Sequence, residues 1–476
     1  MKKKNIFEDK IIEFRQENLG ISIRELSVNS VEIYVLYIQQ LTDKESLSTN
    51  VIKPILQNGK EDMLTIDKIV NSVIYVDDIT IDQDENMIID YVIKGKSIII
   101  LSNDDKYIVA NTLKIEKRGI QQPELDTTLR GPKDSFTENF NDNISLVRYR
   151  IKDPALRIEN YSIGRRTKTN VAVIYIENIA NGKYVDEIKK RLLEIDVDGV
   201  FESGYIQKFI SNSTFDLFPQ TGIVERSDTA CENIIEGKVC VIVEGSNLAI
   251  ISPKTFIEFL DTGDDHFENI YLGFFSKVLR IISLLISLTL SSLYVAAVSF
   301  HSDILPSKYL LAIATSRVTV PFNALLEAIL MEFTAEILRE GSIRLPKQIG
   351  PTIGIVGTIV IGQAAVTAGL VSPLMVIIVA LSIMGSFVSG DYTIMNTIRI
   401  LKFVLIFMTG IFGLFGFVMG ITIIAINLCS QTSFGIPYVA PMSPLNLKDM
   451  KNFIFSDVTL AKERPNFLKT KDKKRQ

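Results

Sequence analysis

Three long runs without a charged residue constrain the second half of this 476-residue chain more than any other feature. They cover residues 281–300, 349–390 and 403–430, and none of them contains Asp, Glu, Lys or Arg. An α-helix rises about 1.5 Å per residue, so about 20 apolar residues match the hydrocarbon core of a bilayer, which is about 30 Å thick. The first and last runs therefore each predict one membrane-spanning helix.

The middle run is about twice as long as the helix that one crossing requires, so we expect it to fold back on itself. Pro373 marks the bend, because proline lacks a backbone donor and disfavours helix in the residue before it. Four crossings would leave the charged N-terminal half and the Lys- and Arg-rich tail on one side, which the positive-inside rule makes cytoplasmic. The predicted spans are 281–300, 349–369, 373–390 and 403–430.

The segment between the first two spans, residues 305–347, carries five Lys or Arg residues, which is unusual for an external loop. Its apolar pattern predicts an amphipathic or re-entrant helix over residues 321–341. Glu332, Glu336 and Glu340 are four residues apart and share one face of that helix. Two interpretations stay open: a helix in the membrane interface with a solvated acidic face, or a helix whose carboxylates line a water-filled path.

Small residues recur every four positions in the middle run, forming a face that lets another helix approach closely in lipid. They are Gly350, Gly354, Thr358 and Gly362. Gln363 is polar within this charge-free run, and it either hydrogen-bonds a neighbouring helix or faces a conduction path. Several copies of the helix around an axis would form a narrow apolar constriction that gates by dewetting. The candidate gate residues are Val356, Ile359, Val360 and Gln363.

The N-terminal half shows one order of elements twice. Residues 171–176 (VAVIYI) are a β-branched run, a helical pattern follows, and residues 238–252 are typical of two strands around a tight turn. Residues 32–38 and 95–110 repeat this order. We therefore predict an α/β soluble N-terminal region of two similar subdomains, followed by an all-α polytopic membrane domain. The predicted divisions are subdomains at 1–120 and 169–265, a connector at 121–168, the transmembrane helical domain at 266–445 and a basic cytoplasmic tail at 446–476.

The connector is mostly polar and rich in arginine. Its candidate residues are Arg130, Arg148, Arg150 and Arg157. The segment is either a solvated linker or a set of bidentate pairs that join subdomains or neighbouring subunits.

No motif for phosphate binding, dinucleotide binding or nucleophilic catalysis is present, so we do not expect an enzyme. His266 lies beside Asp264 and Asp265, a pattern more typical of a solvated loop than of a metal site. The three cysteines are expected to be reduced and buried, and neither a cofactor nor a metal is predicted. A net charge of -4 without a basic stripe gives no indication of a nucleic-acid partner. No secretory signal is evident at the start, so the N-terminal half is expected to be cytoplasmic.

Several long segments from about residue 123 onward carry a family resemblance, among them RGPKDSF, DGVFESGYIQKFI and SFGIPYVAPMSP. In these segments the chain resembles the A subunit of the GerA family of spore germinant receptors. The matching connector positions are Arg130, Gly131, Pro132, Phe136 and Glu138. The matching positions in the helix at 321–341 are Glu327, Glu332, Glu336, Leu338, Arg339 and Glu340.

The resemblance implies a multi-pass protein of the inner spore membrane, with its N-terminal region and tail facing the spore core. It also implies two partners: a B subunit that resembles a transporter and binds germinant, and a C subunit that is a lipoprotein. Copies of the A subunit are expected to assemble as a ring around a pore that releases cations when a nutrient binds. The alternative is a non-conducting scaffold that docks the transporter-like subunit and relays its conformational change.

Overall fold

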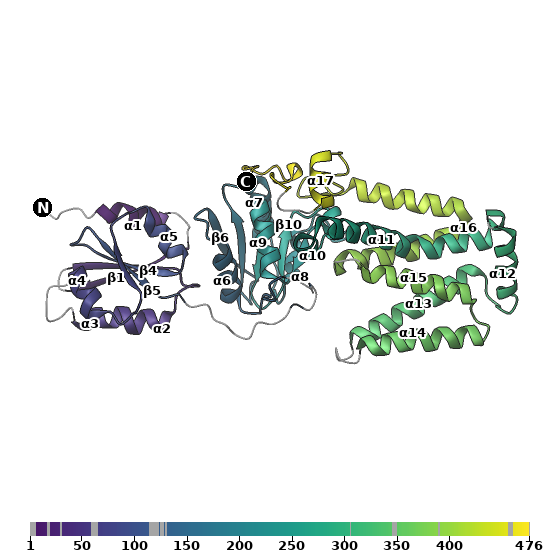
Figure 1. Ribbon diagram of the computed structural model, residues 1–476, viewed down its shortest axis with the longest axis horizontal. Helices are drawn as coiled ribbons and strands as arrows, with labels where there is room; N and C mark the ends of the chain where they lie inside the picture. Colours follow the sequence, from purple (N-terminus) through teal and green to yellow (C-terminus); the bar gives the residue numbers. More distant parts are fainter. Residues whose placement is uncertain are drawn as a thin grey trace. The chain divides into compact units, whose positions relative to one another are not determined.

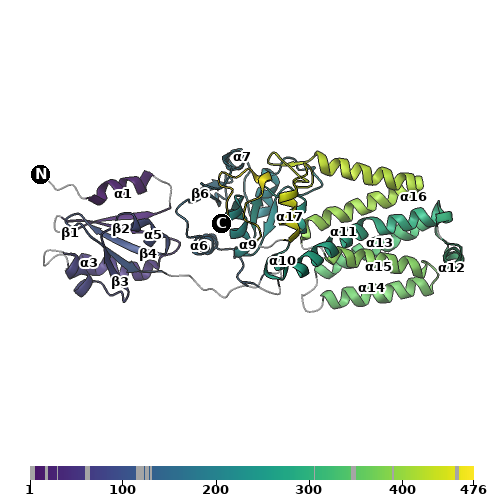
Figure 2. The same ribbon diagram turned by 45° about the horizontal axis from the view of Figure 1, so that its top comes forward.

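A computed structural model of the chain describes residues 6–16, 20–28, 31–58, 65–113, 123, 128, 131–304, 306–344, 350–388, 391–455 and 460–475. These residues form two units (Figures 1 and 2). Unit 1 comprises Met1–Thr214, Thr221–Pro253 and Lys462–Gln476, and unit 2 comprises Phe215–Gln220 and Lys254–Ala461. Unit 1 contains two five-stranded sheets, whereas unit 2 is largely a helical bundle.

The first subdomain of unit 1 is an antiparallel sheet in the order β1-β2-β4-β5-β3 with helices on both faces. Its strands are β1 (Ser22–Val28), β2 (Val31–Tyr37), β3 (Ile79–Asp82), β4 (Lys96–Leu101) and β5 (Tyr107–Asn111). One face is covered by α1 (Ile6–Gln16) and α5 (Met87–Ile93). The other is covered by α2 (Lys44–Ser46), the π-helix η1 (Leu47–Ile52), α3 (Lys53–Asn58), α4 (Ile66–Lys68) and the π-helix η2 (Ile69–Val73). Because both faces are covered, the central strand β4 is an almost continuous apolar run.

The second subdomain repeats this topology, in the order β6-β7-β9-β10-β8. Its strands are β6 (Leu156–Ile163), β7 (Thr169–Ile176), β8 (Gly222–Val224), β9 (Val239–Val243) and β10 (Ala249–Ser252). Its helices are α6 (Phe140–Arg150), α7 (Gly182–Leu193), α8 (Ser203–Ile210) and α9 (Ser227–Glu236). Strands β6 to β10 occupy the same positions in the second sheet as β1 to β5 do in the first. One supersecondary arrangement therefore occurs twice.

The connector expected at 121–168 is corrected by the structure, because most of it belongs to the second subdomain. Helix α6 places Phe140, Ile144 and Val147 in the same apolar core as Ile242. Strand β6 follows and pairs along its whole length with β7. Because the segment is rich in charged residues, its amphipathic helix α6 and its edge strand β6 were not predicted from the sequence.

Unit 2 contains long helices that cover the predicted spans. They are α11 (Ile270–Ser299), α12 (Ser307–Arg317), α13 (Ala324–Ile343), α14 (Gly350–Thr367), α15 (Pro373–Val388) and α16 (Tyr392–Ser430), preceded by η3 (Ile257–Leu260) and α10 (Gly263–Phe267), with η4 (Ser302–Ile304) between α11 and α12. Among the residues searched, α11 and α16 are long and apolar enough to cross a membrane, and α15 is a shorter apolar helix. The predicted bend is present: α15 begins at Pro373, and Gly369 before it has φ +68°.

Helix α16 is not the single crossing expected for residues 403–430. Gly413, at φ 63° and ψ −143°, interrupts it. A Cβ placed on Gly420 would lie 2.5 Å from the Leu405 side chain, although 15 helical residues would span about 22 Å. The second leg therefore packs back on the first, with Ile421 and Ile424 against the core that contains Leu401 (Figure 1). Gly413 makes α16 a helical hairpin.

The C-terminal residues are docked and do not form a free basic tail. After the hairpin come β11 (Thr432–Ser433), β12 (Ile436–Pro437), α17 (Leu447–Phe455) and η5 (Asn466–Leu468). The Arg464 Nε donates to the Ile235 carbonyl at 2.9 Å, and the Lys471 amide donates to the Ile179 carbonyl at 3.0 Å. The last residues are therefore part of the second subdomain's surface.

Candidate functional site, a charged seam inside the helical bundle

Helix α13 carries three glutamates that face other helices of the bundle. It begins at the N-cap Asn323, whose side chain accepts a hydrogen bond from the Leu326 amide at 2.9 Å. From this start, Glu327 and Glu332 point inward and are fully buried, and Glu336 is 21% exposed at the side chain. Each has a cation from outside its own helix beside it. We name this set the charged seam; it consists of Glu327, Glu332 and Glu336 with Arg317, Arg339, Arg399 and Lys402.

The most deeply buried part of the seam joins three helices. The Lys402 ammonium of α16 lies 2.5 Å from Oε2 of Glu332, with side chains 1% and 0% exposed. Ser291 of α11 donates to the other carboxylate oxygen at 2.6 Å. Removing one partner of such a pair leaves an uncompensated charge and costs about 3–5 kcal/mol, so this contact fixes the position of α13 against α11 and α16.

One end of the seam lies where α15 begins. Glu327 Oε1 accepts from both the amide and the hydroxyl of Ser372 at 2.6 Å. The Arg317 Nη2 of α12 lies 3.4 Å from Oε2 of Glu327, and neither that oxygen nor Arg317 Nη1 has a hydrogen-bond partner among the described residues. The Glu327 carboxylate thus connects α12, α13 and α15, and its Oε2 can still accept a hydrogen bond.

The other end joins α13 to α15 and to the first leg of α16. The Arg399 Nη1 lies 3.0 Å from Oε2 of Glu336, and Arg339 Nη1 lies 3.8 Å from Oε1. Arg339 also donates to the Ser386 hydroxyl at 3.1 Å. Buried polar groups are normally satisfied, so the unbonded Arg339 Nε and Glu336 Oε1 of the described structure mark this end as incompletely paired.

Of the remaining predicted residues, three are exposed at the bundle surface, Gly362 is buried, and the others lie outside the described side chains. Val360 is 57% exposed and Gln363 is exposed, both on α14. Gly362 packs on α15, because a Cβ there would lie 3.2 Å from Val376. Glu340 is exposed and pairs with Arg344 at 2.6 Å. At Gly350, Gly354, Val356, Thr358 and Ile359 the structure describes the α14 backbone but not the surroundings of each residue.

The comparison that decides the family covers nearly the whole chain. Residues 9–467 match the family model described as Bacillus/Clostridium GerA spore germination protein. This chain belongs to the GerA family.

Two named relatives and one solved structure are similar to this chain. The GerA-family chain is 35% identical over 461 residues to "Spore germination protein KA" of Bacillus subtilis, covering 96% of this chain and 85% of the relative. It is 33% identical to "Uncharacterized membrane protein YfkQ" of the same organism, covering 93% and 84%. Among solved structures, the N-terminal domain of the A subunit of the Bacillus megaterium spore germinant receptor GerK3 has 26% identity and a TM-score of 0.41, covering 54% of this chain and 98% of that one.

The arginines singled out in this GerA-family chain act within unit 1. Arg150 binds both carboxylate oxygens of Asp134 at 2.7 Å, and its Nε donates to Ser227 at 2.9 Å. Burial raises the pKa of Asp134, but the Ser227 hydroxyl and the Arg150 guanidinium outweigh it and hold that pKa below its ordinary value. Arg157 pairs with Glu177 at 2.7 Å.

Arg148 differs from the other arginines because it is buried. Burial lowers the pKa of its guanidinium to about 10. Arg130 lies outside the described residues. The Arg150 pair with Asp134 lies within one subdomain, and pairing that joins subdomains or subunits stays a prediction.

Sequence reasoning did not predict which cations pair with the seam glutamates, nor the polar contacts at the start of α11. Lys277 pairs with Asp261 at 2.8 Å, and Arg280 pairs with Asp265 at 2.8 Å, so both are bound to protein carboxylates. His266 joins this group through a 3.0 Å contact with Asp261. Burial raises the pKa of Asp261, yet the His266 and Lys277 charges hold it well below its ordinary value. The missed signal was the pair of basic residues just before the first and last apolar runs, Lys277 and Arg280 before residue 281 and Arg399 and Lys402 before residue 403.

Proposed function

We propose that this protein is the A subunit of a nutrient germinant receptor, and that several copies form a cation channel that opens when germinant binds the complex. Membership of the GerA spore germination family supports a role in germination. Two helices long enough to cross a membrane support a membrane location. The channel, the ring of copies and the transporter-like and lipoprotein partner subunits are the further content of the proposal.

The observation that carries the channel is the exposed polar residue on α14. Gln363 lies at the surface of a single bundle, in a helix with no charged residue. In lipid an amide without a hydrogen-bonding partner costs several kcal/mol, so a second copy or water must cover it. Val360 lies on the same helix one turn earlier and is also exposed. A ring of α14 helices would satisfy Gln363 and place Val360 at a narrow apolar constriction.

The proposed topology follows from the ends of the chain. The C-terminal residues are bonded to the second subdomain through Arg464 and Lys471, so they lie on the same side of a membrane as unit 1. This requires an even number of crossings, which the α16 hairpin accommodates. We place unit 1 and the tail on the cytoplasmic side of the inner spore membrane, facing the spore core.

The charged seam supplies the proposed gating element. It connects α13 to α16 through paired charges and to α11 and α15 through serine hydroxyls. Buried charge pairs have few alternative arrangements in a dry interior. A partner that shifts one of these helices would displace α13, and with it the adjacent α14, where a Cβ on Gly357 would lie 3.3 Å from Leu338. Small residues Gly350, Gly354 and Thr358 are proposed to extend this close helix packing. Exposed Glu340 remains the candidate for attracting cations.

Single-channel recording of the purified chain in planar bilayers tests the proposal. Val360→Ser should raise the open probability, because a polar side chain wets an apolar gate. Leu381→Ser is the matched control, since Leu381 of α15 is similarly exposed at 49% but lies on another helix. Equal effects of the two substitutions, or none from Val360→Ser, would refute the placement of the gate.

The second candidate function is a non-conducting scaffold that relays the movement of a transporter-like subunit. The pairing of Glu327 and Glu332 with cations favours it, because paired carboxylates leave no open charged path within one bundle. A purified chain that never conducts, together with a reconstituted complex that releases cations, would establish this function in place of the channel.

A further inference from the structure

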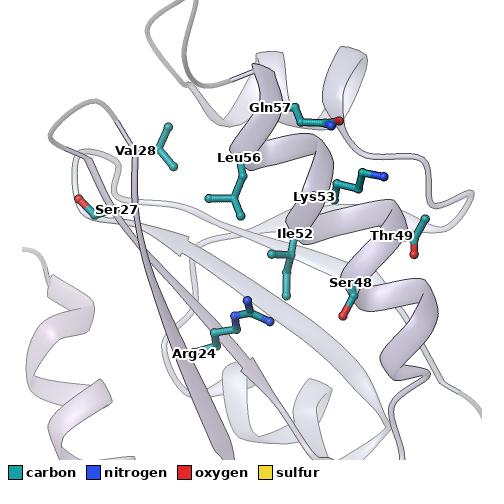
Figure 3. A pocket seen from close by; sticks show the side chains of 9 residues that line it. All are labelled: Arg24, Ser27, Val28, Ser48, Thr49, Ile52, Lys53, Leu56 and Gln57. Atoms are coloured by element: carbon teal, nitrogen blue, oxygen red, sulfur yellow. The ribbon is translucent and has the colours of Figure 1, made fainter.

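The first subdomain contains a cavity of about 730 Å³ between a strand and a helix (Figure 3). Arg24, Ser27 and Val28 of β1 form one wall. The facing wall comes from η1 and α3, where Ile52 and Leu56 are one helical turn apart on the side toward the strand. The volume lies in the range of natural ligand sites, about 300–1,000 Å³. We name this cavity, together with Lys53 on its helical rim, the β1 slot.

The β1 slot contains two cations that have no ion-pair or hydrogen-bond partner within the described residues. They are Arg24 on the strand and Lys53 on the helix, and both are exposed. Elsewhere in this subdomain Lys96 pairs with Asp78 at 3.6 Å, and Arg15 pairs with Glu25. Two unpaired positive charges at one cavity favour an anionic ligand.

The strand wall of the β1 slot is also a free sheet edge. Strand β1 pairs only with β2 in the described sheet, so the backbone donors and acceptors of its other side have no strand beside them. Buried Val28 and Ile52, with partly exposed Leu56, supply an apolar floor next to that edge. An edge strand with a helix alongside and an apolar floor between them is the geometry of peptide recognition by strand addition.

We propose that the β1 slot binds an extended, acidic segment of a partner polypeptide as an additional strand beside β1. Arg24 and Val28 are four residues apart on β1, so they lie on one face of the strand, the face toward the helix that carries Lys53 and Leu56. Every second side chain of the bound segment would face this slot, with acidic ones near Arg24 and Lys53 and apolar ones near Val28 and Leu56. The seven residues of β1 set its length at no more than seven residues.

Fluorescence anisotropy with the full chain in neutral lipid nanodiscs tests this assignment. The probe is a labelled heptapeptide, Asp-Ser-Asp-Ser-Val-Ser-Val, called the Asp-Val probe, and the controls are the same peptide with Asn in place of Asp and a backbone N-methylated version. The Asp-Val probe should bind, and both controls should bind about tenfold more weakly or worse, because one lacks charge and the other lacks backbone donors. The double variant Arg24→Gln, Lys53→Gln should weaken the Asp-Val probe by about tenfold or more.

Matched variants keep the test decisive. Lys106→Gln removes an exposed charge elsewhere in the subdomain and should leave binding unchanged. Arg24→Lys keeps the charge and should restore most of the affinity, which a misfolded variant would not. Equal binding of the N-methylated probe would show a simple anion site and overturn strand addition. If the double variant changed the oligomeric state of the chain, the occupant of the β1 slot would be a second copy of this chain. That result would overturn the assignment to a partner polypeptide.

Discussion

The buried pair of Lys402 and Glu332 gives the most demanding prediction. Lys402→Met removes the ammonium and leaves the Glu332 carboxylate with Ser291 as its described hydrogen-bond donor. Both side chains are essentially inaccessible, at 1% and 0% exposed, so water cannot replace the lost cation. The expected loss is about 3–5 kcal/mol of unfolding free energy. Against a total of about 5–15 kcal/mol for a typical protein, this is a large fraction.

The double variant separates an electrostatic cause from lost packing. Lys402→Met with Glu332→Leu removes both charges and keeps similar volume, so it should recover most of the lost stability, since apolar replacements of buried pairs are often neutral or stabilising. Unfolding of the purified chain in detergent, followed by loss of helical circular dichroism, measures Lys402→Met, Glu332→Leu and the double variant. The coupling energy from this cycle should exceed about 1.5 kcal/mol.

An exposed pair provides the control for this cycle. Glu340→Gln breaks the contact with Arg344, whose side chains are 64% and 76% exposed, and should cost about 0–1 kcal/mol. A Lys402→Met variant as stable as the Glu340→Gln variant would refute the assignment of the seam as a fixed element. So would a double variant as unstable as the single one.

Three further predictions concern other parts of the chain. Gly413→Ala should cost about 1–3 kcal/mol, because φ 63° disfavours a side chain and the added Cβ would meet a phenylalanine ring at 2.9 Å; Gly341→Ala, with open space around it, should be neutral or stabilising. The ion pair of Asp134 contributes fully above the ordinary pKa of 3.8 and is lost as pH falls through its lowered folded-state pKa, so Asp134→Asn should flatten the acid limb of a stability curve. Burial raises the pKa of the Cys231 thiol to about 12, so maleimide at pH 7 should label exposed Cys429 and spare Cys231 until the protein unfolds.

Each of these predictions has an outcome that contradicts it. Equal melting temperatures for the Gly413 and Gly341 variants would argue against the hairpin. A stability curve whose acid limb is the same with and without Asp134 would remove that residue from the acid response. Mass spectrometry that finds Cys231 labelled as fast as Cys429 in the folded chain would contradict its burial.

The sequence alone determined where the helices of the bundle lie, because long charge-free runs allow few other structures. It also located the bend before Pro373 and the repeated order of strands in unit 1. It identified Glu332, Glu336 and Glu340 by their helical spacing, whereas Glu327 came from the family resemblance. These features are local, since they depend on composition and on periodicities within about 20 residues.

Only the tertiary structure decided what those glutamates contact. Lys402 is 70 residues from Glu332, and Arg399 is 63 residues from Glu336, so no local pattern connects them. The reversal at Gly413 was equally hidden, because Gly410, Gly416 and Gly420 lie in the same run and only packing selects which glycine adopts positive φ. Pairing across such distances depends on how the helices fold against one another, and that is a property of the assembled bundle.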